Sequence, residues 1–103
     1  MKWVDTPTFS EDWRRLSNAH REMFLQAIPD FSEARDGFFA DPAQFKWPQR
    51  LRVSRLQGVH GVWEMTWSFA GPDGRATFDF IQLEGDLVLR WRRIGGHAIY
   101  RKP

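Results

Sequence analysis

The spacing of apolar residues changes near residue 50, and this change limits the chain to folds with helices first and a sheet second. Before it, apolar residues recur about every 3.6 positions, as they do on one face of a helix; they are Trp13, Leu16, Met23, Phe24, Ala27 and Phe31. After it they alternate, as on one face of a strand; the clearest set is Trp63, Met65, Trp67 and Phe69. Helices followed by strands joined by short turns predict an α+β fold.

The first half of the chain predicts a helix that begins at Ser10 and ends or bends near Ile28. Ser10 is a good N-cap, and the two acidic residues after it suit the positive end of a helix. Pro29 lacks the N–H that a helix interior needs, so we expect a second short helix or a turn from there to Gly37. Trp3–Asp5 is a short stretch that can pair at a sheet edge.

The second half predicts an antiparallel meander, because short turns separate its strands. The turns are Gly-Pro-Asp-Gly at 71–74 and Glu-Gly-Asp at 84–86. The expected strands are Arg50–Leu56, Val62–Phe69, Arg75–Leu83 and Leu87–Ile94, with Trp63, Met65, Trp67, Phe78 and Phe80 facing the helices. The prediction is one domain over residues 1–103, with an N-terminal helical hairpin packed on one face of a four- to five-stranded antiparallel sheet.

Composition supports a single folded domain with an uneven charge. The chain has 103 residues, 42% of them hydrophobic, and no cysteine, which excludes disulfides and Cys-based zinc sites. It contains no 18-residue apolar run and no basic-then-apolar leader, so we expect a cytoplasmic protein without a membrane partner. Residues 1–49 hold six Lys/Arg against eight Asp/Glu, whereas residues 50–103 hold nine against five, and eight of those nine are Arg. Arginine suits bidentate phosphate recognition, so a polyanionic ligand is favoured.

The sequence carries no signature of a metal site, a cofactor or a serine nucleophile. His20, His60 and His97 lie far apart, and none has another histidine three or four residues away. Neither a Gly-x-Ser-x-Gly motif nor a phosphate-binding glycine loop is present. We therefore expect no metal and no cofactor.

The segment from Arg90 to Tyr100, R-W-R-R-I-G-G-H-A-I-Y, concentrates the residues that suit chemistry on a phosphate. Alternation puts Arg90 and Arg92 on one face of the last strand, and Leu89, Trp91 and Arg93 on the other. Two glycines then release the strand, which places His97 and Tyr100 at or beyond its end. Arg75 opens the neighbouring strand and is expected near Arg93. The plainer interpretation of these charges is a solvated sheet face. The sharper one is RNA cleavage, in which His moves protons and Arg stabilises the charge on the phosphorane.

Four motifs resemble the RelE/ParE superfamily of bacterial toxins. They are L-R-V-x-x-L-x-G from Leu51, W-E-M-T-W from Trp63, D-G-R-A-T-F from Asp73 and W-R-R-I-G-G-H-A-I-Y from Trp91. The order of the expected elements is also similar over nearly the whole chain. W-E-M-T-W stands where many members carry a basic stretch, and Glu64 within it can stand in for an acidic catalytic partner.

The resemblance implies a role for each candidate residue. His97 takes the place of the general acid, Arg75 that of the arginine at the scissile phosphate, and Tyr100 that of the aromatic residue behind the histidine. Arg93 lies on the same closing segment and is expected to help hold the phosphate charge. The expected peripheral RNA contacts are Arg52, Arg55, Arg90 and Arg92.

The function that this resemblance implies is that of the toxin in a type II toxin-antitoxin pair. Such a toxin is a metal-independent mRNA endoribonuclease acting on ribosome-bound message, and its expected partners are a cognate antitoxin, mRNA and the ribosome. Two alternatives stay open. One is a ParE-like toxin that binds a topoisomerase and cuts no RNA, and the other is a non-toxic, phage-derived binding module.

Overall fold

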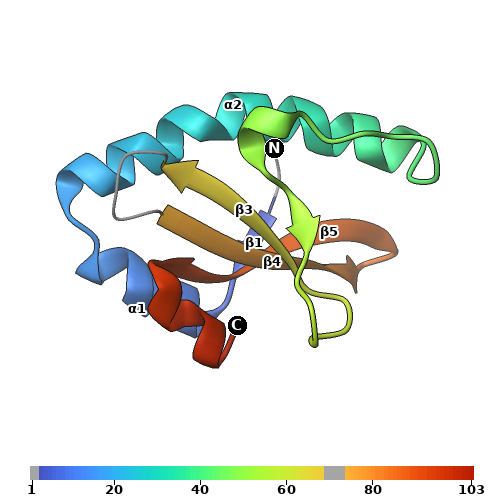
Figure 1. The fold of residues 1–103 in the computed structure, drawn as a ribbon. Coiled ribbons are helices and arrows are strands. Elements are labelled where there is room, and N and C mark those ends of the chain that lie inside the picture. Colours follow the sequence, from blue (N-terminus) through green and yellow to red (C-terminus); the bar gives the residue numbers. More distant parts are fainter. Residues whose placement is uncertain (1–2, 69–73) are drawn as a thin grey trace.

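A computed structural model describes residues 3–68 and 74–103 of the chain (Figure 1). It is an α+β fold with two helices and a five-stranded mixed sheet. In chain order the elements are β1 (Trp3–Asp5), α1 (Pro7–Arg15), α2 (Asn18–Ala40), the 3₁₀ turn η1 (Gln49–Leu51), β2 (Ser54–Arg55), β3 (Trp63–Ser68), β4 (Gly74–Leu83), β5 (Asp86–Gly95) and the 3₁₀ helix η2 (His97–Arg101). Neither helix among these residues has both the length and the apolar character needed to cross a membrane.

The sheet has the strand order β1-β5-β4-β3-β2. Strands β2 to β5 form the predicted antiparallel meander. The turn between β4 and β5 is also confirmed: Glu84 and Gly85 have φ angles of 52° and 86°, as a tight two-residue hairpin of type I′ requires. Most of the turn predicted at 71–74 lies outside the described residues.

An antiparallel sheet throughout was the wrong expectation, because β1 pairs with β5 in parallel, with Trp3 beside Leu89. Short turns dictate direction only between strands that follow each other along the chain. Between β1 and β5 lie both helices and the other strands, so no turn constrains the direction of β1.

The helices divide at Leu16 rather than at Pro29. Thr6 caps α1, and its hydroxyl accepts a hydrogen bond of 3.0 Å from the Phe9 N–H. A second N-cap, Ser17, starts α2, which continues past Pro29 to Ala40. The predicted single helix from Ser10 to Ile28 is therefore wrong at both ends. Pro29 is tolerated because it lies on the exposed side of α2, where water can bond the carbonyl that loses its partner.

The core lies between α2 and one face of the sheet. The Phe31 ring lies 5.2 Å from those of Phe78 and Trp91, and Phe38 lies 5.5 Å from Trp63 and 5.6 Å from Phe80. All five side chains predicted to face the helices belong to this core or pack against it. That part of the sequence prediction is confirmed.

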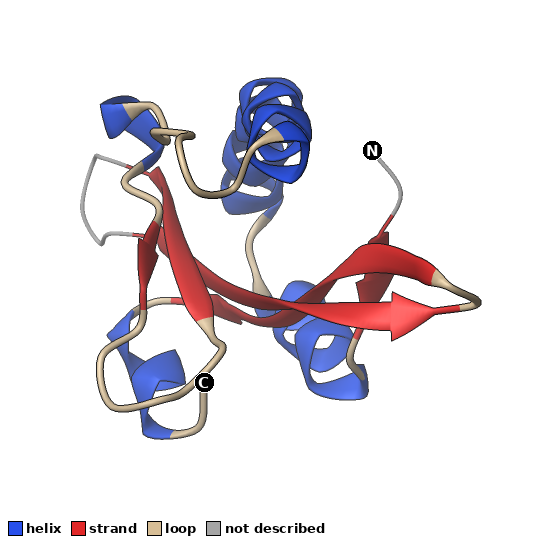
Figure 2. Ribbon diagram, turned by 90° about the vertical axis from the view of Figure 1, so that its right-hand side faces the viewer, coloured by secondary structure: helices blue, strands red, loops and turns tan. Residues whose placement is uncertain are grey.

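Helix α1 does not lie beside α2 on that face. Figures 1 and 2 show α2 on one side of the sheet, with α1 and η2 on the opposite side. Helix α1 packs along the edge of β5 that the short strand β1 leaves uncovered. There the Thr6 hydroxyl donates to the Arg92 carbonyl at 2.7 Å, and the Ile94 N–H donates to an Asp12 carboxylate oxygen at 3.1 Å. Phe9 of α1 still packs against Phe24 of α2 and Trp91 of β5, at 6.3 Å and 6.0 Å between ring centres. Helix α1 thus shares the core with α2, but it covers a sheet edge rather than lying beside α2 on the face.

Candidate functional site

A β-bulge in β5 decides where its arginines lie. Phe78 of β4 pairs with Trp91 and Thr77 pairs with Arg93, so Arg92 has no opposite partner. Trp91 and Ile94 are both buried, which leaves the two residues between them on the polar face. The prediction that Arg93 shares a face with Leu89 and Trp91 is therefore wrong, because a bulge shifts the alternation by one residue.

Carboxylates hold the three arginines of β5. Arg90 and Arg92 both bind Asp79, at 2.6 Å and 2.9 Å. Arg93 binds both oxygens of Asp12, at 2.6 Å and 3.1 Å. The hydrogen bonds to these carboxylates raise the pKa values of Arg90 and Arg93. The Arg93 ion pair joins α1 to β5, which is a structural task that the sequence does not suggest.

A second polar cluster forms around Glu64 in the middle of β3. The Tyr100 hydroxyl donates to one Glu64 carboxylate oxygen at 2.6 Å, and the Ser54 hydroxyl donates to the other at 3.3 Å. Arg75 also interacts with Tyr100, and its cationic charge favours the tyrosinate. Elements far apart in the sequence, β2, β3, β4 and η2, thus bring their polar side chains together here.

This cluster borders an open cavity of about 480 Å³. Its lining residues are Ser54, Arg55, Leu56, Gln57, Glu64 and Tyr100. The Arg55 guanidinium lies 5.0 Å from the centre of the Trp63 ring, a cation–π contact that holds it at the rim. Of the predicted site residues, the structure thus brings Arg75, Tyr100 and Arg55 to one region.

The remaining predicted residues lie elsewhere or are described only in part. Residue 97 begins η2, one turn of 3₁₀ helix before Tyr100. Strand β5 ends at Gly95, one residue beyond the predicted end at Ile94. Arg52 is exposed and follows η1 in a left-handed conformation, with φ of 45°. The predicted strand Arg50–Leu56 is correspondingly wrong in length, because β2 contains two residues.

Metal ligands do not gather in the described part of the chain: residues 3–68 and 74–103 contain no group of three His, Cys, Asp or Glu side chains placed to hold an ion. His20 packs against the Trp67 ring, with 5.6 Å between ring centres. This contact gives that histidine a packing role.

The Tyr100 hydroxyl should titrate well above its ordinary range. Burial, the hydrogen bond to Glu64 and the Glu64 charge raise the pKa of Tyr100 to about 12, against an opposing effect of Arg75. Since Tyr100 is the sole tyrosine, the tyrosinate absorbance of the folded protein reports it alone. We expect a midpoint near pH 12, and a lower midpoint in Glu64→Gln. Because the unfolded chain loses this proton near pH 10, the stability that it contributes is intact below pH 10 and is lost as pH rises toward 12.

A wild-type midpoint near pH 10 would contradict the Tyr100–Glu64 hydrogen bond. Glu22→Gln, on the exposed surface of α2, is the matched control and should leave the midpoint unchanged.

Sequence reasoning missed two carboxylates. Asp79 had a visible signal, since it alternates with Phe78 and Phe80 on β4 and so belongs to the polar face. No sequence signal pointed to Asp12, because it lies 81 positions before Arg93. Comparisons of the chain with protein-family models, with curated proteins and with solved structures found no match.

Proposed function

We propose that the protein is a metal-independent endoribonuclease, the toxin of a type II toxin-antitoxin pair, acting on ribosome-bound message. The observation that supports this most is the meeting of the Glu64 carboxylate, the Tyr100 hydroxyl and Arg75 beside one open cavity. A carboxylate can accept a proton, and an arginine can stabilise negative charge on a phosphate. RNA cleavage by its own 2′-hydroxyl needs both groups.

In the proposed reaction Glu64 accepts the proton of the 2′-hydroxyl. The 2′ oxygen then forms a bond to the adjacent phosphorus, and the bond from phosphorus to the 5′ oxygen breaks. His97 gives its proton to the leaving 5′ oxygen, and Arg75 stabilises the phosphorane charge. The products are a 2′,3′-cyclic phosphate and a free 5′-hydroxyl. Glu64 then releases its proton and His97 takes one up by exchange with water before the next turnover.

Tyr100 has a positioning task in this scheme. A tyrosine hydroxyl is protonated at neutral pH, so Tyr100 is a hydrogen-bond donor to Glu64, and its raised pKa extends this to alkaline pH. Together with Ser54 it directs the carboxylate from two sides. A carboxylate that is fixed at the wall of an open cavity can accept a proton from a ligand bound there.

The test is cleavage of RNA by the purified protein, with and without ribosomes and in the presence of a chelator. We expect fragments with 2′,3′-cyclic ends and growth arrest on expression. His97→Ala and Arg75→Ala should abolish both, and Arg52→Ala should weaken RNA binding more than the cleavage step. The expected antitoxin is the product of the gene next to that of this protein. It should bind the protein and restore growth.

Other outcomes would favour the alternatives. Growth arrest with intact RNA, unchanged in folded His97→Ala and Arg75→Ala, would replace the nuclease with a topoisomerase-binding toxin. Normal growth on expression, with no cleavage, would point to a binding module.

A further inference from the structure

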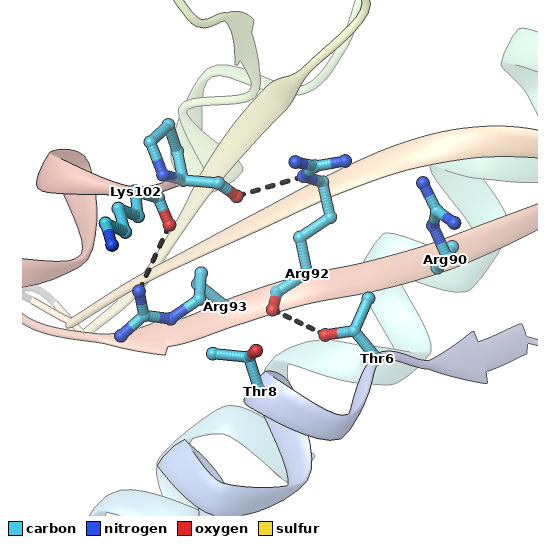
Figure 3. A pocket seen from close by; sticks show the side chains of 7 residues that line it. Thr6, Thr8, Arg90, Arg92, Arg93 and Lys102 are labelled. Atoms are coloured by element: carbon cyan, nitrogen blue, oxygen red, sulfur yellow. Dashed lines mark hydrogen bonds between the residues drawn. The ribbon is translucent and has the colours of Figure 1, made fainter.

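A second cavity, which shares no lining residue with the cavity at the Glu64 cluster, lies on the side of the sheet where α1 and η2 pack. It has a volume of about 360 Å³ and is lined by Thr6, Thr8, Arg90, Arg92, Arg93, Lys102 and Pro103. Figure 3 shows the three arginines of β5 and Lys102 around it, with the two threonines at the start of α1. Four of the seven lining residues are cationic, and none has an acidic side chain.

The bulge in β5 creates this concentration of charge. In a regular strand Arg92 and Arg93 would point to opposite faces. The extra residue puts both on the polar face with Arg90, so three arginines within four positions face the same cavity. Bulges often re-aim side chains next to functional sites.

The carboxylates behind the cavity do not use all the donors of these cations. Arg90 binds Asp79 through Nε and Nη2, and Arg92 binds Asp79 through Nη1 and the Pro103 main-chain oxygen through Nε. Each guanidinium carries five N–H groups, so donors remain on Nη1 of Arg90 and on Nη2 of Arg92. The side chains of Arg90 and Arg92 are 34% and 32% exposed, so a ligand can reach them.

Lys102 adds a cation that no side-chain carboxylate neutralises within the described parts of the chain. Its main-chain carbonyl accepts from Arg93 at 3.1 Å, which holds the residue at the cavity, and its side chain is free to meet an anion. Four positive charges face the side-chain carboxylates of Asp12 and Asp79 and the Pro103 oxygen that accepts from Arg92. The excess positive charge, the planar donors and the two threonine hydroxyls match a phosphate group.

The position of the cavity connects it to the proposed reaction. Arg93, Thr77 and Glu64 are paired in register across β5, β4 and β3, so Arg93 lies about 10 Å from Glu64 at two strand spacings. Helix η2 carries Tyr100 to the first cavity, and Lys102 directly after it lines the second. A single-stranded RNA bound at Glu64 can therefore place a neighbouring backbone phosphate in the second cavity.

We propose that this cavity binds a backbone phosphate of the RNA strand, at a site separate from the bond that is cut. The inference rests on the proposed function only in taking RNA as the ligand. It assigns Arg90, Arg92 and Lys102 to holding the strand.

The experiment measures binding without cleavage, using a single-stranded 2′-deoxy oligonucleotide as the probe. Affinity is measured at several salt concentrations for wild type, Lys102→Gln, Arg92→Gln and the double variant. Each single variant should bind several-fold more weakly, and the slope of log K against log salt should become shallower by about 0.7 for each phosphate that the variant no longer neutralises. The matched control is Arg50→Gln, which removes an exposed arginine paired with Asp30 outside this cavity.

The outcomes separate the two proposals. Weaker binding in the cavity variants, with wild type cutting no RNA, would retain the phosphate site and overturn the nuclease. Cleavage by wild type, with Lys102→Gln and Arg92→Gln binding as tightly as Arg50→Gln, would overturn the phosphate site alone. Failure of wild type to bind the probe would also overturn it. Melting temperatures verify folding, and the Lys102 side chain makes no hydrogen bond or ion pair to the described residues that its replacement would break.

Discussion

Glu64→Gln should lower the rate of RNA cleavage by about 10²–10⁴-fold, the usual range for losing a positioned general base. Gln has nearly the shape of Glu and can still accept a hydrogen bond from Tyr100, so the cluster around β3 should keep its geometry. The amide cannot take the 2′-hydroxyl proton. The measurement is the single-turnover cleavage rate at saturating RNA, with circular dichroism to confirm folding.

The matched control for this substitution is Glu22→Gln, which removes an exposed carboxylate from α2. It should cut RNA at the wild-type rate. If Glu64→Gln is as active as this control, Glu64 is not the base. If Tyr100→Phe lowers the rate while Glu64→Gln does not, the hydroxyl acts by itself rather than through the carboxylate.

Asp12→Asn should destabilise the fold by about 3 kcal/mol, at the lower end of the range for breaking a buried ion pair. The Asp12 side chain is 7% exposed and that of Arg93 is 20% exposed, so removing the carboxylate leaves a largely buried guanidinium without its partner. The Ile94 N–H at the edge of β5 also loses a charged acceptor. For a domain of this size the melting temperature should fall by roughly 10–20 °C.

Asp30→Asn provides the comparison, since it removes an aspartate from another Asp–Arg pair. Asp30 and Arg50 are 51% and 63% exposed, and exposed pairs contribute at most about 1 kcal/mol. Thermal unfolding of the two variants side by side should show a large loss of stability for Asp12→Asn and almost none for Asp30→Asn. Equal losses would mean that the Asp12–Arg93 pair does not anchor α1.

The sequence predicts most reliably what neighbouring residues determine. Alternation identifies β3, β4 and β5 and their inward side chains, because burial on one face repeats every second residue. Residues on one face of a regular strand are separated by an even number of positions. The apolar residues Trp91 and Ile94 are three positions apart, and this odd spacing indicates the bulge. The division of the helices at Leu16 was also readable, since Thr6 and Ser17 are both good N-caps.

Contacts between distant segments could not be predicted in the same way. The parallel pairing of Trp3 with Leu89 and the ion pair of Asp12 with Arg93 each join residues more than 80 positions apart. Neither contact produces a periodic pattern in the sequence. For the site, the motifs indicated Arg75, Tyr100 and, as a stand-in, Glu64, whereas the carboxylates that hold the arginines of β5 emerged from the tertiary structure.

The parallel pairing of β1 with β5 has a consequence for the order of folding. Loop closure over so many residues is entropically costly and slows folding. During synthesis β1 and α1 leave the ribosome first, but the strand edge that they cover exists only after β5 has been made. The nascent chain therefore carries an unpaired first strand until late in translation, and Tyr100, which follows β5, completes the Glu64 cluster later still. On this ordering, partly synthesised chains lack the assembled Glu64 cluster, so the RNA cleavage proposed for this cluster would begin only when translation of the domain is essentially finished.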